Sequence, residues 1–303
     1  LIEIWKCLIK MKKEYQKNPG LTPDDIGKLR EWLTTQPHLP SKYITDLDLI
    51  LTYHCCENSA EVSKQVLDLH FTLKTLFTAF FSQRVLDQRL RTALRTALIQ
   101  PLPTPSVNGY RVIYCRLLDT DSKNFIFSDI VKLFLMVFEL WQYEEGTWPG
   151  FVIMVDMDQA TLAHIAQLDV MSVKQVLYFL QESMLVKLKE VHFLNATSLI
   201  DKLMMLIKPF MKKELLDILR IHQRDSDTLD PFVHSHSLPK EDGGDFKSRN
   251  ILKEEQLSRI EANLEFFEKE SKKRVDESVR PGKKTTIEDV FGIQGSFKKL
   301  DID

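Results

Sequence analysis

The hydrophobic pattern of the chain changes at a proline-rich joint, residues 100–106, and this change limits the possible folds more than any other feature. Before the joint, apolar residues recur at helical spacing, which predicts an all-α bundle. After it, short runs rich in β-branched and aromatic residues alternate with helical segments. Because the three prolines fix φ and remove backbone donors, we expect neither a helix nor a strand to cross the joint.

The order of the segments after the joint predicts an α/β fold. The expected elements are 111–117 (strand), 128–144 (helix), 151–157 (strand), 160–166 and 173–184 (helices), and 188–194 (strand). Strands that alternate with helices form a mostly parallel sheet with right-handed crossover connections. Beyond residue 246 the chain becomes highly charged, and residues 251–273 are expected to form a helix on the domain surface.

Composition excludes several classes of protein. A net charge of −2 over 303 residues argues against a protein built to hold nucleic acid, so no nucleic-acid partner is expected. No apolar run approaches the ~20 residues that span a bilayer, and charged residues interrupt the first segment too often for a signal peptide. The four cysteines have no disulfide-framework spacing. We therefore expect a cytoplasmic protein.

No pattern in the sequence points to catalysis. The chain has no glycine-rich phosphate loop, dinucleotide-binding fingerprint or nucleophile elbow. Three short groupings are weak metal candidates: Asp156 with Asp158, His54 with Cys55 and Cys56, and His234 with His236. None has further ligands at a suitable spacing, and structural roles explain each more simply. We expect no enzymatic activity, no metal site and no cofactor.

The segment 198–213 is unusually apolar for a helix that only covers a core. Nine of its sixteen residues are Leu, Ile, Met or Phe, and it turns basic after Pro209. A covering helix normally has a single apolar stripe. Either this segment is an ordinary core helix, or it covers a cavity on one side and meets a membrane on the other.

Three motifs in the second half of the chain resemble the CRAL-TRIO lipid-transfer family. They are residues 191–195 (VHFLN), 207–211 (IKPFM) and 238–244 (LPKEDGG), in that order and spacing. Residues 22–95 resemble the helical N-terminal domain of this family, and residues 280–283 and 291–300 are similar to the tail of arthropod members. The resemblance covers about residues 20–300. It implies an N-terminal domain (1–100), a lipid-binding domain (101–245) and a charged C-terminal helix and tail packed on that domain (246–303).

The resemblance also implies an architecture and a function. A five-stranded, mostly parallel twisted sheet would form the floor of a closed lipid cavity, with segment 198–211 as a mobile gate. The expected function is binding of a tocopherol-, retinoid-, carotenoid- or sterol-like lipid and its transfer between membranes, by a monomer that touches the membrane transiently. The implied cavity residues are Phe134, Phe138, Phe151, Val155, Leu162, Leu168, Val176, Phe179, Leu180, Met184, Val186, Leu188, Val191, Ile200, Leu203 and Ile207. The Val176–Met184 part of this set is also the apolar stripe of its own predicted helix.

Two departures from the family pattern bear on the ligand and on one turn. Tocopherol-binding relatives have serine at the positions of Phe134 and Phe138, so this cavity is expected to disfavour ring-hydroxylated ligands. Asp242 occupies a turn position where the family usually has an aromatic residue, and the sequence offers no explanation for that change.

Basic residues near the gate are candidates for binding phosphoinositide head groups. Lys187 and Lys189 match two positions of the family's basic cleft, and they are two residues apart on a predicted strand, so both should leave the same face. The other two matched positions carry Glu214 and Ile218. Lys212, Lys213 and Arg220 lie nearby and are candidate substitutes, with a solvated helix face as the alternative.

A second function class stays open. The protein could be a lipid-sensing adaptor in which the charged segment 246–280 recruits a protein partner.

Overall fold

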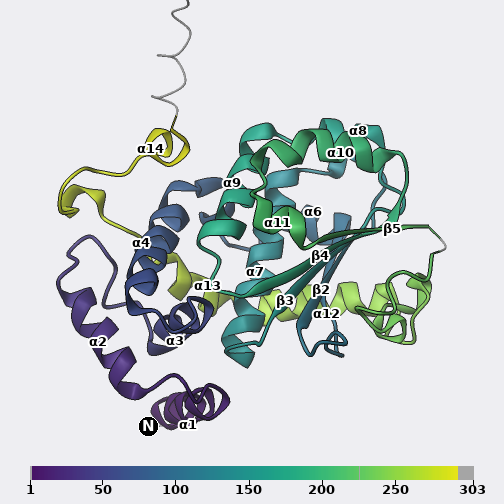
Figure 1. Ribbon diagram of the computed structural model, residues 1–303. Coiled ribbons are helices and arrows are strands. Elements are labelled where there is room, and N and C mark those ends of the chain that lie inside the picture. Colours follow the sequence, from purple (N-terminus) through teal and green to yellow (C-terminus); the bar gives the residue numbers. More distant parts are fainter. Residues whose placement is uncertain (1, 225, 293–303) are drawn as a thin grey trace, which may run out of the picture.

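The computed structural model describes residues 2–224 and 226–292, with side chains described from residue 10 onward. A helical region packs beside a five-stranded sheet (Figure 1). Its helices are α1 (Ile2–Lys17), α2 (Pro23–Thr34), α3 (Asp46–Cys55), α4 (Ala60–Leu76), α5 (Thr78–Phe81) and α6 (Gln88–Thr96). Thr22 begins α2 by accepting a hydrogen bond from the backbone N–H of Asp25, as a capping box does.

The sheet has the strand order β1-β2-β3-β4-β5, with β1 antiparallel to β2 and the other pairs parallel. The strands are β1 (Ala97–Pro101), β2 (Arg111–Leu117), β3 (Phe151–Asp156), β4 (Leu188–Ala196) and β5 (Leu219–Gln223). The predicted fold class, α/β with a mostly parallel sheet after an all-α region, is confirmed. Runs rich in β-branched and aromatic residues identified β2, β3 and β4 but not the two edge strands.

As expected, no described helix or strand crosses the proline-rich joint, although β1 runs into it and ends at Pro101. β1 is an edge strand, and its last residue needs no ladder donor, so proline is tolerated there. The open edge is closed by Gln256, whose side-chain oxygen accepts a hydrogen bond from the backbone N–H of Ile99 at 2.9 Å. A side chain thus takes the place of a sixth strand.

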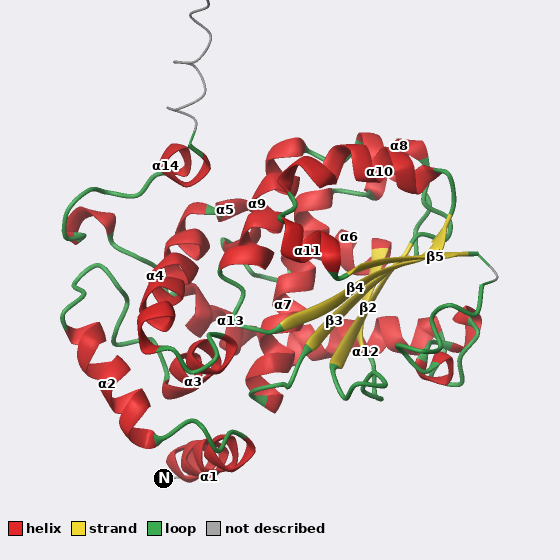
Figure 2. Cartoon of the chain, viewed as in Figure 1, coloured by secondary structure: helices red, strands yellow, loops and turns green. Residues whose placement is uncertain are grey.

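Helices cover one face of the sheet and loops cover the other. The crossover helices are α7 (Phe127–Glu145), α8 (Leu162–Ala166), α9 (Val170–Glu182), α10 (Leu199–Ile207) and α11 (Lys213–Asp217). In Figure 2, α8, α9 and α10 lie together above the sheet. Ile113, Ile153 and Phe193 face this helical side, whereas their strand neighbours, such as Val112 and Val152, pack under the loops.

The C-terminal segment packs on the same body. It contains α12 (Arg249–Ala262), α13 (Leu264–Ser271) and α14 (Ile287–Phe291). The single helix expected at 251–273 is therefore interrupted at Asn263. Leu252, Ile260 and Phe267 are fully buried, and the ring of Phe291 stacks on Phe77 at 6.0 Å. Most of the tail motif at 291–300 lies outside the described residues.

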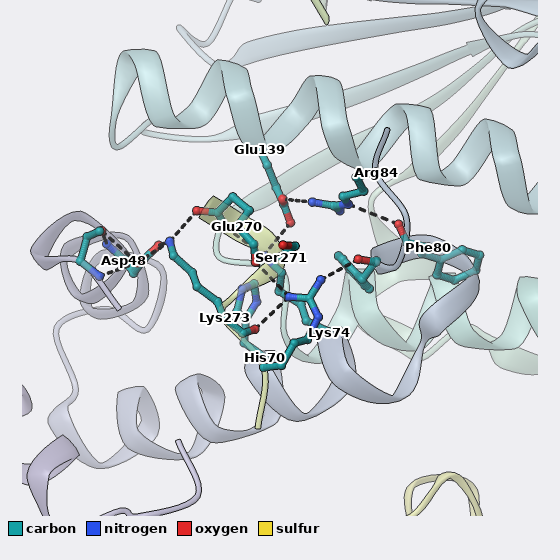
Figure 3. A network of polar contacts seen from close by, with 12 residues as sticks. Asp48, His70, Lys74, Phe80, Arg84, Glu139, Glu270, Ser271 and Lys273 are labelled. Carbon is teal, nitrogen blue, oxygen red and sulfur yellow. Dashed lines mark hydrogen bonds and ion pairs between the residues drawn. The ribbon is translucent and has the colours of Figure 1, made fainter. Parts of the chain in front are cut away.

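A buried network of charges joins the helical region to the sheet domain (Figure 3). Lys74 of α4 is 2% exposed, and its ammonium lies 3.1 Å from Glu139 of α7 and 3.2 Å from Glu270 of α13. Lys273 bridges Glu270, at 2.6 Å, and Asp48 of α3, at 2.8 Å. Four helices from three parts of the chain therefore meet at one set of ion pairs. We call this set the charge junction.

Burial and charge act in opposite directions at the centre of the charge junction. Burial alone would raise the pKa of the Glu139 carboxyl, but the neighbouring cations Arg84 and Lys74 outweigh it and hold that pKa below its usual range. Glu139 is therefore a carboxylate at neutral pH, and the junction depends on its full complement of partners.

Replacing Lys74 with Met should lower the free energy of unfolding by about 3 kcal/mol. This is the low end for a broken buried pair, because Arg84 and Lys273 still contact the two carboxylates. Urea denaturation measures the change. The control Lys64→Met removes an exposed ion pair with Glu61 on the same helix and should cost less than about 1 kcal/mol. Equal effects of the two substitutions would contradict the role given to the junction.

Candidate ligand cavity

A cavity of about 330 Å³ lies between the helical face of the sheet and the helices that cover it. Its floor comes from the strands, through Ile99, Cys115, Ile153, Val155 and Phe193. Its walls come from α7 and α9, and α10 covers it. Almost every lining residue is apolar, and a void of this kind loses dispersion contacts unless a ligand fills it.

Two charged residues border the cavity without offering it a free charge. Arg116 is the penultimate residue of β2 and Asp156 is the last residue of β3, and they pair with each other at 2.7 Å. Asp156 also accepts a hydrogen bond from the hydroxyl of Tyr114 at 2.6 Å, and Tyr114 belongs to the cluster under the loops on the other face of the sheet. Since residues two apart on a strand share a face, Arg116 follows Tyr114 to that side.

The remaining polar groups at the cavity are neutral. Burial raises the pKa of the Cys115 thiol to about 12, so it stays protonated. Burial also lowers the pKa of His164, whose Nδ1 accepts a hydrogen bond from the backbone N–H of Thr161 at 3.2 Å. A site with these properties suits an uncharged, apolar molecule.

Helix α10 presents different residues to the two sides, as its sequence predicts. Leu199, Leu203 and Ile207 recur every four residues and line the cavity. Met205 lies on the outer side and is 72% exposed. Leu206, the next residue along the helix, is half-buried.

The structure brings nine of the sixteen predicted cavity residues together at the cavity. They are Phe134, Val155, Leu168, Val176, Phe179, Leu180, Met184, Leu203 and Ile207. All four residues of the predicted apolar stripe are among them: Val176, Phe179 and Leu180 in α9, and Met184 just after it. The helical period therefore selected the right face of this segment.

The other seven predicted residues lie elsewhere. Phe138, Phe151, Val191 and Ile200 are buried in the surrounding core, and Val186 and Leu188 line a groove on the outer surface. Leu162 is 62% exposed on α8. Phe138 lies next to Phe134, with ring centroids 6.5 Å apart, but one turn further along α7 it packs against Trp148 and Phe151.

Sequence reasoning missed much of the floor. Ile153 and Phe193 stand two residues from the predicted Val155 and Val191, so strand alternation alone would have placed them on the same face. Ile99 belongs to β1, which the pattern did not identify. Leu199 lies one helical turn before Leu203 and follows the same period.

The basic residues do not form one cluster. Lys189 and Lys212 line the outer groove, a depression of about 590 Å³ that also contains Glu182, Glu214 and Ile218. Lys187 instead pairs with Glu57 at 2.9 Å. Lys213 pairs with Asp217, and the Arg220 guanidinium donates to the backbone carbonyls of Asp217 and Leu219.

The expectation that Lys187 and Lys189 share a strand face is wrong. β4 begins at Leu188, and its register with β3 shifts so that Phe151 pairs with Leu188 and Val152 with Glu190. Lys189 is the extra residue at this irregularity, and the period of two does not hold across a bulge.

The three metal candidates have structural roles, and the described residues contain no group of three side chains that could hold a metal ion. Asp156 belongs to the Arg116 pair, and its other oxygen accepts from the backbone N–H of Asp158 at 2.8 Å. His54 contacts the backbone carbonyl of Trp148 at 2.9 Å. His234 and His236 are exposed and stack on each other.

Comparison with known proteins identifies the domain around the cavity. Residues 97–244 match the family model described as CRAL/TRIO domain, and residues 18–89 match the model described as Pinta-like, UBA domain. The chain therefore contains the domain of the CRAL-TRIO family, a family of lipid-binding transfer proteins, as its three motifs predicted. None of the described helices is long and apolar enough to cross a membrane.

Its similarity to individual relatives is distant but extends along most of the chain. Clavesin-1 of Mus musculus is 24% identical over 240 residues, which cover 78% of this chain and 67% of that protein. The Alpha-tocopherol transfer protein-like protein of Homo sapiens is 23% identical over 236 residues, which cover 78% and 69%. Among solved structures, that of Sfh5 matches with a TM-score of 0.44 and 11% identity, over 92% of this chain and 99% of that one.

Phe134 and Phe138 should respond differently to truncation. Phe134→Ala enlarges the cavity and should admit bulkier apolar ligands at little cost in stability. Phe138→Ala leaves a hole in packed core and should cost about 3–5 kcal/mol. Urea denaturation combined with binding of a size series of apolar probes measures both effects. If Phe138→Ala alone widened the range of ligands, the cavity boundary described here would be wrong.

Proposed function

We propose that this protein binds one hydrophobic small molecule in the cavity and transfers it between membranes. The observation that carries the proposal is the apolar space of about 330 Å³ under α10, bordered by no unpaired charged side chain. Each CH₂ group of a ligand buried there contributes about 0.8 kcal/mol. The walls could thus hold an extended hydrocarbon without any ion pair.

The class of ligand follows from the shape and polarity of the walls. We propose a tocopherol-, retinoid-, carotenoid- or sterol-like lipid, with a preference for those that bring no ring hydroxyl to α7. Phe134 presents an aromatic ring there and no hydroxyl. A ligand hydroxyl buried without a hydrogen-bond partner would weaken the binding free energy by about 1–3 kcal/mol.

Helix α10 would act as the gate, and its surroundings would meet the membrane. Met205 on α10, Leu162 on α8, and Val170 and Met171 on α9 are all well exposed, and α10 contacts both α8 and α9. Large exposed apolar side chains that gather over a cavity entrance suit a lipid surface. The protein would then be a cytoplasmic monomer that docks transiently and catalyses no reaction.

The adaptor alternative has no observation that favours it. It relied on the segment 246–280 being available to a partner, whereas α12 and α13 bury Leu252, Ile260 and Phe267 in the body of the protein. Lipid transfer is therefore the function proposed here.

Vesicle-to-vesicle transfer of a fluorescent apolar lipid tests the gate and separates its two sides. Met205→Asp puts a charge on the outer side, and it should slow transfer at least fivefold while ligand affinity in solution stays unchanged. Leu203→Asp puts a charge into the cavity and should weaken ligand binding itself. Wild-type transfer by both variants would show that α10 is not a gate.

We further propose that docking is weakly coupled to phosphoinositides through the outer groove, by Lys189 and Lys212 alone. Lys187, Lys213 and Arg220 do not line this groove, and each has a partner elsewhere on the protein. Glu182 pairs with Lys212, and Glu214 lines the same groove. Two carboxylates among two ammonium groups leave little net attraction for a phosphate.

Reversing the charge at Glu214 should therefore strengthen the weak preference of the wild type for phosphoinositide over neutral vesicles. Glu214→Lys should raise binding to phosphoinositide vesicles about fivefold to thirtyfold, because each cation near an anionic surface is worth about 1 kcal/mol. Cosedimentation with phosphoinositide and with neutral vesicles measures this. Glu31→Lys on α2 makes the same charge change far from the groove. An equal gain in binding with that variant would mean that the net charge of the protein, and not the groove, determines its binding to phosphoinositide vesicles.

A further inference from the structure

The gate segment is tied to the rest of the protein by very few polar contacts. In the described part of the chain, the hydrogen bonds and ion pairs that join residues 198–212 to elements other than the adjoining α11 all come from Gln181 or Glu182, at the end of α9. The remaining hydrogen bonds of residues 198–212 are local to the segment, such as that from the N–H of Ile200 to the carbonyl of Thr197.

The side-chain amide of Gln181 holds the C-terminal end of the gate. Its Nε2 donates to the backbone carbonyl of Phe210 at 3.0 Å, and its Oε1 accepts from the backbone N–H of Lys212 at 2.7 Å. These two backbone groups flank the point where the chain leaves the helical turn Lys208–Phe210. One amide thus satisfies a donor and an acceptor that no regular element pairs.

The N-terminal end of the gate is fixed in another way. β4 leads directly into α10 through Asn195, whose φ of 52° is in the left-handed region that asparagine tolerates. The Asn195 amide donates to Asp156 at 2.8 Å, so this residue is anchored to the end of β3. The middle of the gate has only apolar contacts with the protein, through residues such as Leu199, Leu203 and Ile207.

We infer that α10 opens from its C-terminal end, with residues 195–198 as the hinge and Gln181 as the latch that holds it closed. This inference rests on the gate role proposed above. Gln181 is a positioning residue, because it contacts the gate backbone and does not need to touch the lipid. Apolar contacts can slide, whereas the two hydrogen bonds have to break before Phe210 and Lys212 move away from α9.

Replacing Gln181 with Leu removes both hydrogen bonds at similar side-chain size. In ligand-free protein, hydrogen–deuterium exchange of backbone amides in 199–212 should become about tenfold faster, while exchange in β3 and the melting temperature stay nearly unchanged. In lipid-loaded protein, the rate of lipid release should rise by a similar factor. Gln181→Glu keeps the acceptor for the N–H of Lys212 but loses the donor to the carbonyl of Phe210. Its exchange and release rates should therefore lie between those of the wild type and those of Gln181→Leu.

Gln167→Leu, at the exposed position that follows α8, is the matched control and should change neither rate. Unchanged exchange in Gln181→Leu would overturn the latch, and so would faster exchange confined to residues 195–200, because the hinge would then lie at the other end. The exchange measurement needs no ligand. If wild type took up no lipid while Gln181→Leu still loosened 199–212, the proposed function would fail and the latch would stand.

Discussion

The charge junction is the contact on which the cavity depends. A domain with a void beside its sheet gives up apolar contacts that would otherwise hold its helices in place. Lys74, Glu139 and Glu270 fix α4, α7 and α13 to one another from outside that void. Because Glu139 lies on the same helix as Phe134, the junction also holds a wall of the cavity in position. The walls can then stay apart without collapsing into the empty space.

Against this frame, α10 is held lightly. Its neighbours α7 and α9 are part of the main hydrophobic core, whereas Ile200 is the one residue of α10 that is fully buried in the described structure. Elements that move are drawn from the parts of a protein with few buried contacts. A rigid frame and a weakly attached cover are what a carrier needs if its ligand enters and leaves intact.

The sequence predicted the features of the fold that depend on residues close together in the chain. The α9 stripe and the inner face of α10 follow from the helical period, and β2, β3 and β4 follow from runs of β-branched residues. The edge strands escaped prediction because β1 contains a proline and β5 is exposed at most of its positions. Their place depends on neighbours that are distant in sequence.

Contacts over long sequence separations account for the other differences. Asp242, unexplained from the sequence, pairs with Arg116 at 2.6 Å and also with Arg249. It therefore binds the loop after β5 to the end of β2, 126 residues away. Lys187 was expected to face a membrane, but Glu57 from the helical region neutralises it. The local motifs around Asp242 and Lys187 do not predict these partners, because the partners lie far away in the sequence.

Native mass spectrometry of the protein purified from its own source tests the central claim most directly. If the cavity carries a lipid, the spectrum should show one apolar molecule bound per chain, and Leu203→Asp should remove it while the protein stays folded. A spectrum of bare protein, together with no uptake of tocopherol-, retinoid-, carotenoid- or sterol-like lipids offered in excess, would contradict the account.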